Sequence, residues 1–214
     1  MTRKLYIAND VEASGHMLGH DAPLSWGACV VPQDSLSKDE LIRQGLVFYT
    51  ELKPTSFNFD IEAMRVGCVG LRCIEGLDHP KYDVTSPEFS PAAVLDVLAE
   101  RGETLTNAVR RFKEWAVPLS NHAHGYYPIE GVVDTTFFDS GWINYIFGMA
   151  RERSLYGHRG LDLASVFRGY ERNLDARLKS LGMVDDREVA HCSEDDAIFL
   201  AGQAREVLFK RMLA

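Results

Sequence analysis

The sequence contains no long apolar run. A membrane-spanning helix needs about 18 consecutive apolar residues, and no run in this chain approaches that length. Its first residues open directly into a strand-like pattern and lack the apolar stretch of a signal peptide, so we expect a cytoplasmic protein without a membrane partner. Only four cysteines occur, with neither a CxxC pair nor the spacing of a zinc ribbon. We expect reduced, mostly buried thiols, which excludes a scaffold held together by disulfides.

An excess of basic charge is also absent. The 214 residues include 31 acidic and 23 basic side chains, which gives a formal net charge of −8 at pH 7. This balance argues against a protein that coats long duplex DNA, because such binding needs a dense surface of lysine and arginine. The deficit is uneven: the first 150 residues hold 12 basic and 20 acidic side chains, and the remainder holds 11 of each.

The hydrophobic pattern predicts an α/β fold. Apolar residues make up 46% of the chain and no long linker divides it, so we expect a single domain over residues 1–214. Short apolar runs predict buried strands at 5–8, 26–31, 46–52 and 131–133. Helical spacing predicts helices at 60–65, from Pro91 with Ser90 as N-cap, and at 105–116, 139–151, 161–181 and 191–213. The order predicts a mixed β-sheet, with its first three strands antiparallel, flanked by helices.

Two carboxylates follow the first predicted strand, in the segment Asp10-Val11-Glu12. Residues two apart in an extended chain point to the same face, so both carboxylates project into one small volume. Two unpaired carboxylates repel each other, and a hard divalent cation such as Mg²⁺ or Mn²⁺ removes the conflict because it prefers oxygen ligands. The alternative is a pair of solvated acids at a strand end, and so short a motif does not decide between the two.

Two later segments carry further candidates. Asp139 lies where the predicted fourth strand gives way to a helix, and there it is either a functional acid or an N-cap that accepts amide hydrogen bonds. His191 precedes the last predicted helix, and Asp196 falls in its first turns, so both can reach the same end of the sheet. The alternatives are an exposed loop histidine and an acid favoured by the helix N-terminus.

Taken in order, these segments resemble the three motifs of the DEDDh 3′→5′ exonucleases, which belong to the ribonuclease-H-like superfamily. The stretch 10–15 is similar to the first motif, Phe138-Asp139 to the second, and His191 with Asp196 to the third. The segments 26–31 and 48–54, with Glu62-Ala63 after them, are similar to the parts that join the first two motifs, so the resemblance spans about residues 4–207.

The subtype follows from the third motif. A histidine five residues before the last aspartate is typical of the DEDDh type, whereas the sister subfamily has a tyrosine four residues before it, where this chain has Cys192. One departure lies in the second motif. The family often carries a His-Asn pair before Phe-Asp, and here the stretch 134–137 reads Asp-Thr-Thr-Phe.

The resemblance implies two-metal hydrolysis of phosphodiester bonds. Two Mg²⁺ or Mn²⁺ ions, about 4 Å apart, would be held by four carboxylates. His191 would act as general base by accepting a proton from the attacking water. The products would be nucleoside 5′-monophosphates released from the 3′ ends of single-stranded DNA or RNA, and many relatives pair as dimers, so a homodimer is also expected. The implied metal ligands are Asp10, Glu12, Asp139 and Asp196.

Other functions stay open at this stage. They are an oligoribonuclease-like or RNA 3′-end trimming enzyme, a non-catalytic ribonuclease-H-like domain that binds nucleic acid, and a metal-binding protein with unrelated chemistry. The intact set of five residues favours an enzyme over the non-catalytic domain, because a scaffold has no need of four converging acids.

Further side chains are candidates for contact with substrate. Small residues after Glu12 let a ligand approach the backbone, and Met17 or Leu18 would pack on the terminal base. Trp142 is either a substrate contact or a core residue. The substrate-contact candidates are Ala13, Ser14, Gly15, Met17, Phe138 and Trp142. A basic stripe forms either a solvated helix face or a phosphate-contacting ridge, and it consists of Arg168, Arg172, Arg177 and Lys179.

Overall fold

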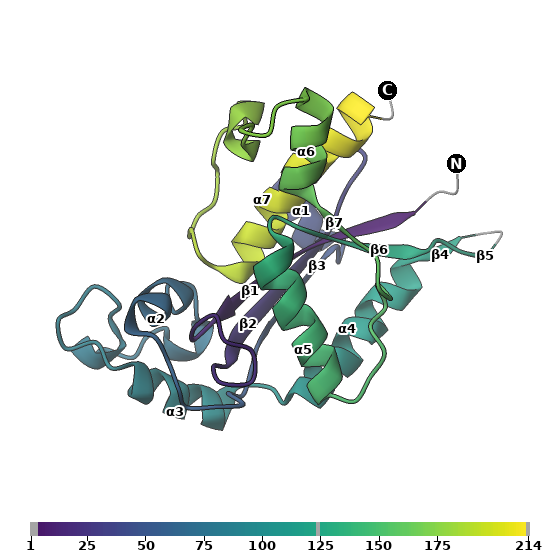
Figure 1. The fold of residues 1–214 in the computed structure, drawn as a ribbon. Helices are drawn as coiled ribbons and strands as arrows, with labels where there is room; N and C mark the ends of the chain where they lie inside the picture. Colours follow the sequence, from purple (N-terminus) through teal and green to yellow (C-terminus); the bar gives the residue numbers. More distant parts are fainter. Residues whose placement is uncertain (1–3, 123–124, 213–214) are drawn as a thin grey trace.

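The computed structural model describes residues 4–122 and 125–212, and its centre is a five-stranded sheet in the order β3-β2-β1-β6-β7 (Figure 1). β1 and β2 pair antiparallel, as do β2 and β3, whereas β6 pairs parallel with both β1 and β7. The mixed sheet with three antiparallel strands at its start is therefore confirmed. The strands are β1 (Leu5–Ala13), β2 (Pro23–Val30), β3 (Val47–Glu51), β6 (Ile129–Val133) and β7 (Gly160–Asp162).

β1 is longer than its apolar run predicts. It continues past Ala8 to Ala13 because Val11 and Ala13 are buried on the same face as Ile7. Asp10 and Glu12 therefore lie inside the strand, and they project to the opposite face because side chains alternate along a strand. Antiparallel pairing sets Asp10 against Gly27 and Glu12 against Ser25 of β2.

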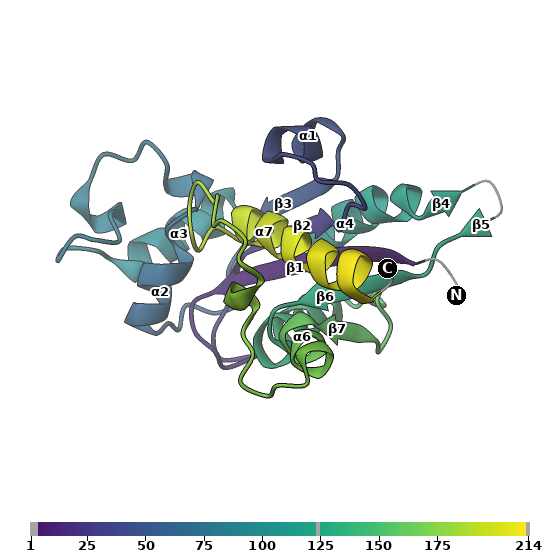
Figure 2. The ribbon, with the colours of Figure 1, turned by 90° about the horizontal axis from the view of Figure 1, so that it is seen from above.

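Helices cover both faces of the sheet (Figures 1 and 2). One hydrophobic core joins the sheet to α4 (Leu105–Leu119) and α5 (Gly141–Met149), with Trp26 and Phe112 fully buried in it. The second core joins the other face to α6 (Leu163–Glu171) and α7 (Ser193–Arg205). In the described chain, no helix has both the length and the apolar character needed to cross a membrane.

A third apolar cluster lies under α2 (Ile61–Gly67) and α3 (Pro91–Arg101). The segment 70–90 joins these helices and contains two 3₁₀ turns, Arg72–Ile74 and Pro80–Tyr82. Its residues Leu71, Cys73 and Phe89 are buried in the cluster, so this turn-rich segment is an ordered excursion. The predicted N-cap of α3 is confirmed, since Ser90 Oγ accepts a hydrogen bond from Ala93 N.

Some elements differ from the prediction and others were not predicted. One that was not predicted is α1 (Lys38–Arg43), which lies in the polar connection 32–45 and is stabilised by a capping box between Ser37 and Glu40. The predicted helix 161–181 is divided into β7, α6 and a 3₁₀ turn, because Asp162 caps α6 and Arg172 ends it in the left-handed conformation. A small hairpin of β4 (Asn121–His122) and β5 (Gly125–Tyr126) was not predicted. The last helix begins at Ser193 and continues as a π-helix at Glu206–Met212; its predicted end at Leu213 is outside the described residues.

Gly27 allows α7 to pack directly on β2. A Cβ atom on Gly27 would lie 1.9 Å from Ser193 O and 2.7 Å from Glu194 N. We predict that Gly27→Ala lowers the free energy of unfolding by about 1–3 kcal/mol, because overpacking forces α7 to shift. Gly148→Ala on α5 is the control; no atom lies within 4 Å of its Cβ position, and it should stabilise by about 0.5–1 kcal/mol. Thermal unfolding measures both, and a Gly27→Ala protein as stable as wild type would contradict this packing.

Candidate active site

The five residues implied by the three motifs line one cleft, which lies at the end of β1 and has a volume of about 440 Å³. β1 contributes Asp10 and Glu12, the turn before α5 contributes Asp139, the segment before α7 contributes His191, and the first turn of α7 contributes Asp196. We call this hollow the acidic cleft, because the described residues that line it include seven carboxylates and no lysine or arginine. These carboxylates belong to Asp10, Glu12, Asp60, Glu62, Asp134, Asp139 and Asp196.

Asp139 does not cap α5. It lies in a π-helical turn, Thr136–Ser140, and the N-cap position of α5 is occupied by Ser140, whose side chain makes no capping bond. Instead, Asp139 Oδ1 accepts a hydrogen bond of 3.2 Å from the backbone N of Val11 in β1. The capping interpretation of Asp139 is therefore wrong, and the bond to β1 holds this carboxylate beside Asp10 and Glu12.

His191 and Asp196 face Glu12 across the cleft. Ligand atoms of Glu12, His191 and Asp196 all lie within 4.8 Å of one another. His191 is exposed and has a positive φ of 63°, a backbone conformation that costs free energy for any residue other than glycine. This left-handed residue lies two positions before the start of α7.

Burial and mutual repulsion disfavour ionisation of these acids. Burial, followed by the negative charges of Asp139 and Glu12, raises the pKa of Asp10 well above its usual range. Burial together with the charges of Asp196 and Asp139 raises the pKa of Glu12 to about 8. Burial raises the pKa of Asp139 to about 7, although the hydrogen bond from Val11 N opposes this shift. Among the described residues that line the cleft, no lysine or arginine neutralises Asp10, Glu12 or Asp139.

The donor set fits hard divalent cations. Asp10 Oδ2 is buried and has no hydrogen-bond partner among residues 4–122 and 125–212, so one lone-pair acceptor is held without a donor. Such an atom costs free energy unless a cation or a proton satisfies it. The carboxylates of Asp10, Glu12, Asp139 and Asp196 supply the oxygen ligands that Mg²⁺ and Mn²⁺ prefer, and a cation here would relieve the repulsion that raises their pKa values.

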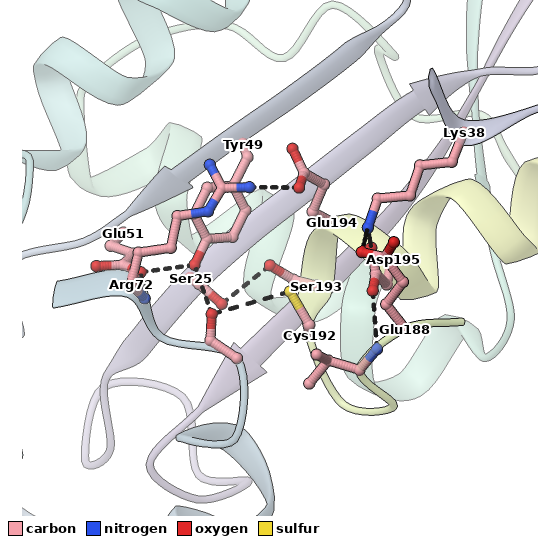
Figure 3. A network of polar contacts seen from close by, with 12 residues as sticks. Ser25, Lys38, Tyr49, Glu51, Arg72, Glu188, Cys192, Ser193, Glu194 and Asp195 are labelled. Atoms are coloured by element: carbon pink, nitrogen blue, oxygen red, sulfur yellow. Dashed lines mark hydrogen bonds and ion pairs between the residues drawn. The ribbon is translucent and has the colours of Figure 1, made fainter. Parts of the chain in front are cut away.

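A polar network outside the cleft holds the segment that carries His191 (Figure 3). Lys38 of α1 places its Nζ 2.8 Å from Asp195 Oδ1 and 2.5 Å from Glu188 Oε2. Asp195, whose side chain is only 4% exposed, also accepts a hydrogen bond of 3.0 Å from Val189 N. Glu188 and Val189 come shortly before His191, so α1 and the first turn of α7 fix this segment from two sides.

Arg187 and Arg72 add two further ties. Arg187 Nη1 donates to Asp196 Oδ1 at 2.8 Å, and its Nε donates to Asp185 Oδ1 at 2.8 Å. Arg72 pairs with Glu194 and stacks on the ring of Tyr49, with its guanidinium carbon 4.4 Å from the ring centroid. The start of α7 is thus joined to the segment before it and to β3.

The network can be tested by amide hydrogen exchange. We predict that Lys38→Met speeds exchange at Val189 N by about tenfold or more, because the buried Asp195 carboxylate loses its ion-pair partner and an uncompensated buried charge is strongly destabilising. Lys113→Met is the control, since Lys113 pairs with Glu152 at 2.6 Å on α4, away from this segment. Unchanged exchange at Val189 in Lys38→Met would show that the network does not hold the His191 segment.

The candidate substrate contacts divide into two groups. Ala13, Gly15 and Phe138 line the acidic cleft, and Met17 is 55% exposed on the loop between β1 and β2. Two others are structural, which corrects their assignment as substrate contacts. The Ser14 hydroxyl donates to Asn58 O and accepts from Ala22 N, so its buried side chain joins two loops. The Trp142 side chain is 1% exposed and belongs to the hydrophobic core.

Asp134 is a cleft residue that the motifs did not single out. It lies directly after β6, in the stretch where the chain departs from the family's His-Asn pair, and its charge contributes to the raised pKa values of Asp10 and Asp139. A signal was present in the sequence, because Asp134 follows the apolar run 131–133 as Asp10 follows an apolar run. Asp60 and Glu62 reach the cleft from the start of α2.

No protein-family model matches this sequence, and no curated protein sequence matches it. Solved structures do match. The nuclease domain of 3′hExo, a DEDDh family member bound to rAMP, has a TM-score of 0.66 and 13% identity, over 97% of this chain and 92% of that chain. E. coli Exonuclease I in complex with a dA16 oligonucleotide has a TM-score of 0.61 and 13% identity, over 99% of this chain and 42% of that chain. The chain has the fold of the DEDDh exonucleases.

A DEDDh exonuclease fold agrees with the resemblance that the motifs carry. The zinc-bound form of the E. coli Exonuclease I complex with single-stranded DNA also matches, with a TM-score of 0.60 and 13% identity, over 99% of this chain and 41% of that chain. The chain therefore spans less than half the length of the E. coli enzyme, and nearly all of the 3′hExo nuclease domain. At 13% identity, the likeness establishes the fold alone, and the activity has to be inferred from the residues of the acidic cleft.

Proposed function

We propose that this protein is a metal-dependent 3′→5′ exonuclease that releases nucleoside 5′-monophosphates from single-stranded DNA or RNA. The observation that carries the proposal is the convergence of Asp10, Glu12, Asp139, His191 and Asp196 in one cleft of a DEDDh exonuclease fold. Four of these residues are carboxylates on three separate elements, and folding brings them together at a cost in repulsion that a protein without a cation there has no reason to bear.

The carboxylates of Asp10, Glu12, Asp139 and Asp196 would hold two Mg²⁺ or Mn²⁺ ions. When bound, such ions lower the pKa of a coordinated water and stabilise the leaving 3′ oxygen of the scissile phosphodiester. The Val11 N–H bond orients Asp139, and the Arg187 guanidinium orients Asp196. Each contact limits the movement of a metal-ligating carboxylate before the substrate binds.

His191 is the proposed general base. Its imidazole lies next to Glu12 and Asp196, where a ring nitrogen can accept a proton from the attacking water. Because His191 is exposed, the proton can pass from the imidazole to solvent. Phe138, Ala13 and Gly15 would border the terminal nucleotide, since they line the same cleft.

A degradation assay with a panel of substrates tests this function. Labelled single- and double-stranded oligonucleotides of DNA and RNA are incubated with the protein in Mg²⁺, in Mn²⁺ and in EDTA. We expect loss of nucleotides from single strands with either metal and none in EDTA. The DNA and RNA arms separate a general exonuclease from an RNA 3′-end trimming enzyme, and absence of hydrolysis in both metals would contradict the proposal.

A further inference from the structure

A second hollow opens beside the acidic cleft. It has a volume of about 590 Å³ and lies among α6, the 3₁₀ turn Leu178–Leu181 and α7. We call it the basic groove, because its lining includes Arg168, Arg177, Lys179 and Arg187. The two hollows are continuous in their lining, since Asp10, Asp134, Thr135 and Asp196 border both. The proposed metal ligands Asp10 and Asp196 thus stand where the two hollows meet.

The two hollows differ in charge, because among the described residues only the basic groove has lysine and arginine in its lining. The acidic cleft has no lysine or arginine in its lining, so a phosphate is attracted there only where a bound cation reverses the local charge. A nucleic-acid strand carries one phosphate per nucleotide, and the phosphates beyond the scissile bond need other cations. The basic groove supplies four such side chains next to the catalytic acids, on a chain whose net charge is −8.

Two of these four basic side chains already make polar contacts with other residues of the described chain, and two do not. Arg187 is engaged by Asp185 and Asp196, and Arg168 Nε donates to Ala176 O. Arg177 and Lys179 are exposed, and within residues 4–122 and 125–212 their side chains make no ion pair and no hydrogen bond.

These contacts reduce the basic stripe predicted from the sequence to two candidates for phosphate contact. Arg172 belongs to the stripe by spacing but does not line the groove. Arg168 is bound to the chain itself, which leaves Arg177 and Lys179 as the two side chains free to meet a ligand.

We propose that the basic groove binds the sugar–phosphate backbone of a single strand upstream of its 3′-terminal nucleotide, with Arg177 and Lys179 contacting phosphates. This inference rests on the proposed function, because it assumes that the terminal nucleotide occupies the acidic cleft. A single strand fits better than a duplex, since a duplex presents two backbones and needs a wider basic surface than one groove beside seven carboxylates.

Equilibrium binding tests the groove without relying on hydrolysis. A 5′-labelled 20-nucleotide oligothymidylate is titrated with wild type and with the double variant Arg177→Gln/Lys179→Gln in Ca²⁺, and binding is followed by fluorescence anisotropy at several salt concentrations. We expect the double variant to bind roughly tenfold more weakly. We also expect its slope of log K against log salt to be smaller by about 1.4, since each single-strand phosphate contact contributes about 0.7. Arg110→Gln on α4, across the sheet, is the control and should bind like wild type.

A small substrate separates the groove from the catalytic centre. The p-nitrophenyl ester of thymidine 5′-monophosphate has no upstream backbone, so its hydrolysis by the double variant should stay within about twofold of wild type, while KM for the oligothymidylate rises. Unchanged oligonucleotide affinity and salt slope would overturn the groove assignment, as would equal losses on duplex and single strand. If neither substrate is hydrolysed by wild type, the proposed function fails, and the binding arm still decides whether the groove holds a single strand.

Discussion

Asp10→Asn should make the metal-free protein more stable and, at the same time, abolish its metal-dependent hydrolysis. The pKa of Asp10 is raised by burial and by the neighbouring carboxylates, so its ionised form is disfavoured in the folded chain. An amide of the same shape removes one negative charge from the acidic cleft without leaving a void. We expect the variant to unfold at a higher temperature than wild type in EDTA at pH 8, because the folded variant no longer holds the disfavoured charge.

The same shifts fix the sign of the pH dependence. Glu12 and Asp139 have pKa values of about 8 and about 7 in the fold, against ordinary values of 4.5 and 3.8 for these side chains. Between these limits the folded protein holds more protons than the unfolded chain, so the free energy of unfolding falls as pH rises from about 4 to about 8. Thermal unfolding in EDTA across this range should show the fall in wild type and a weaker fall in Asp10→Asn.

Added Mn²⁺ should reverse the order of stability. Wild type should gain in Tm with increasing Mn²⁺ above pH 7, because binding to the folded chain shifts the equilibrium away from the unfolded one. Asp10→Asn should gain much less, since one ligand has lost its charge. A variant that is less stable than wild type in EDTA, or that hydrolyses oligonucleotides at the wild-type rate, would contradict this account of Asp10.

The second large effect concerns His191. We expect His191→Asn to lower kcat by about 10²–10⁴-fold, because the attacking water loses its proton acceptor. Asparagine is chosen because it tolerates the positive φ of 63° at this position better than alanine does. Calorimetric titration with Mn²⁺ should show that metal binding is retained, since the four carboxylates are untouched.

His158→Asn is the matched control for this variant. His158 is an exposed histidine beside β7 and does not line the acidic cleft. It should leave kcat and metal affinity unchanged. If His191→Asn kept the wild-type kcat, His191 would not be the base; if it lost Mn²⁺ affinity together with activity, His191 would be a ligand.

The motifs predicted which residues meet, and the structure explains why. The alternation of β1 carries Asp10 and Glu12 to one face, and the sequence contained that rule once the strand was recognised. Its full length was not predictable from apolar residues alone, because the acids themselves interrupt the pattern between Ala8 and Ala13. The position of Asp139 was ambiguous for a similar reason, since an aspartate before a helix is a normal N-cap, and only the contact with Val11 N in β1 excludes that role.

Long-range contacts account for the remaining differences. Helical spacing over 161–181 did not reveal that its first residues pair as β7 with β6, because such pairing depends on a strand far away in the sequence. Lys38 and Asp195 are distant in sequence, and no local pattern predicts their ion pair or its effect on the His191 segment. The basic stripe was visible by spacing, but which of its members line the basic groove depended on the tertiary structure around the end of α6 at Arg172.

The polarity and products of hydrolysis test the central claim most directly. One single-stranded oligonucleotide is labelled at its 5′ end and another at its 3′ end, and both are followed over time with wild type and Asp10→Asn in Mn²⁺. We predict a ladder of shortening 5′-labelled products, immediate release of a labelled nucleoside 5′-monophosphate from the 3′-labelled strand, and no reaction with Asp10→Asn. Shortening from the 5′ end, internal cuts, products with 3′-phosphates, or equal activity in Asp10→Asn would contradict the assignment.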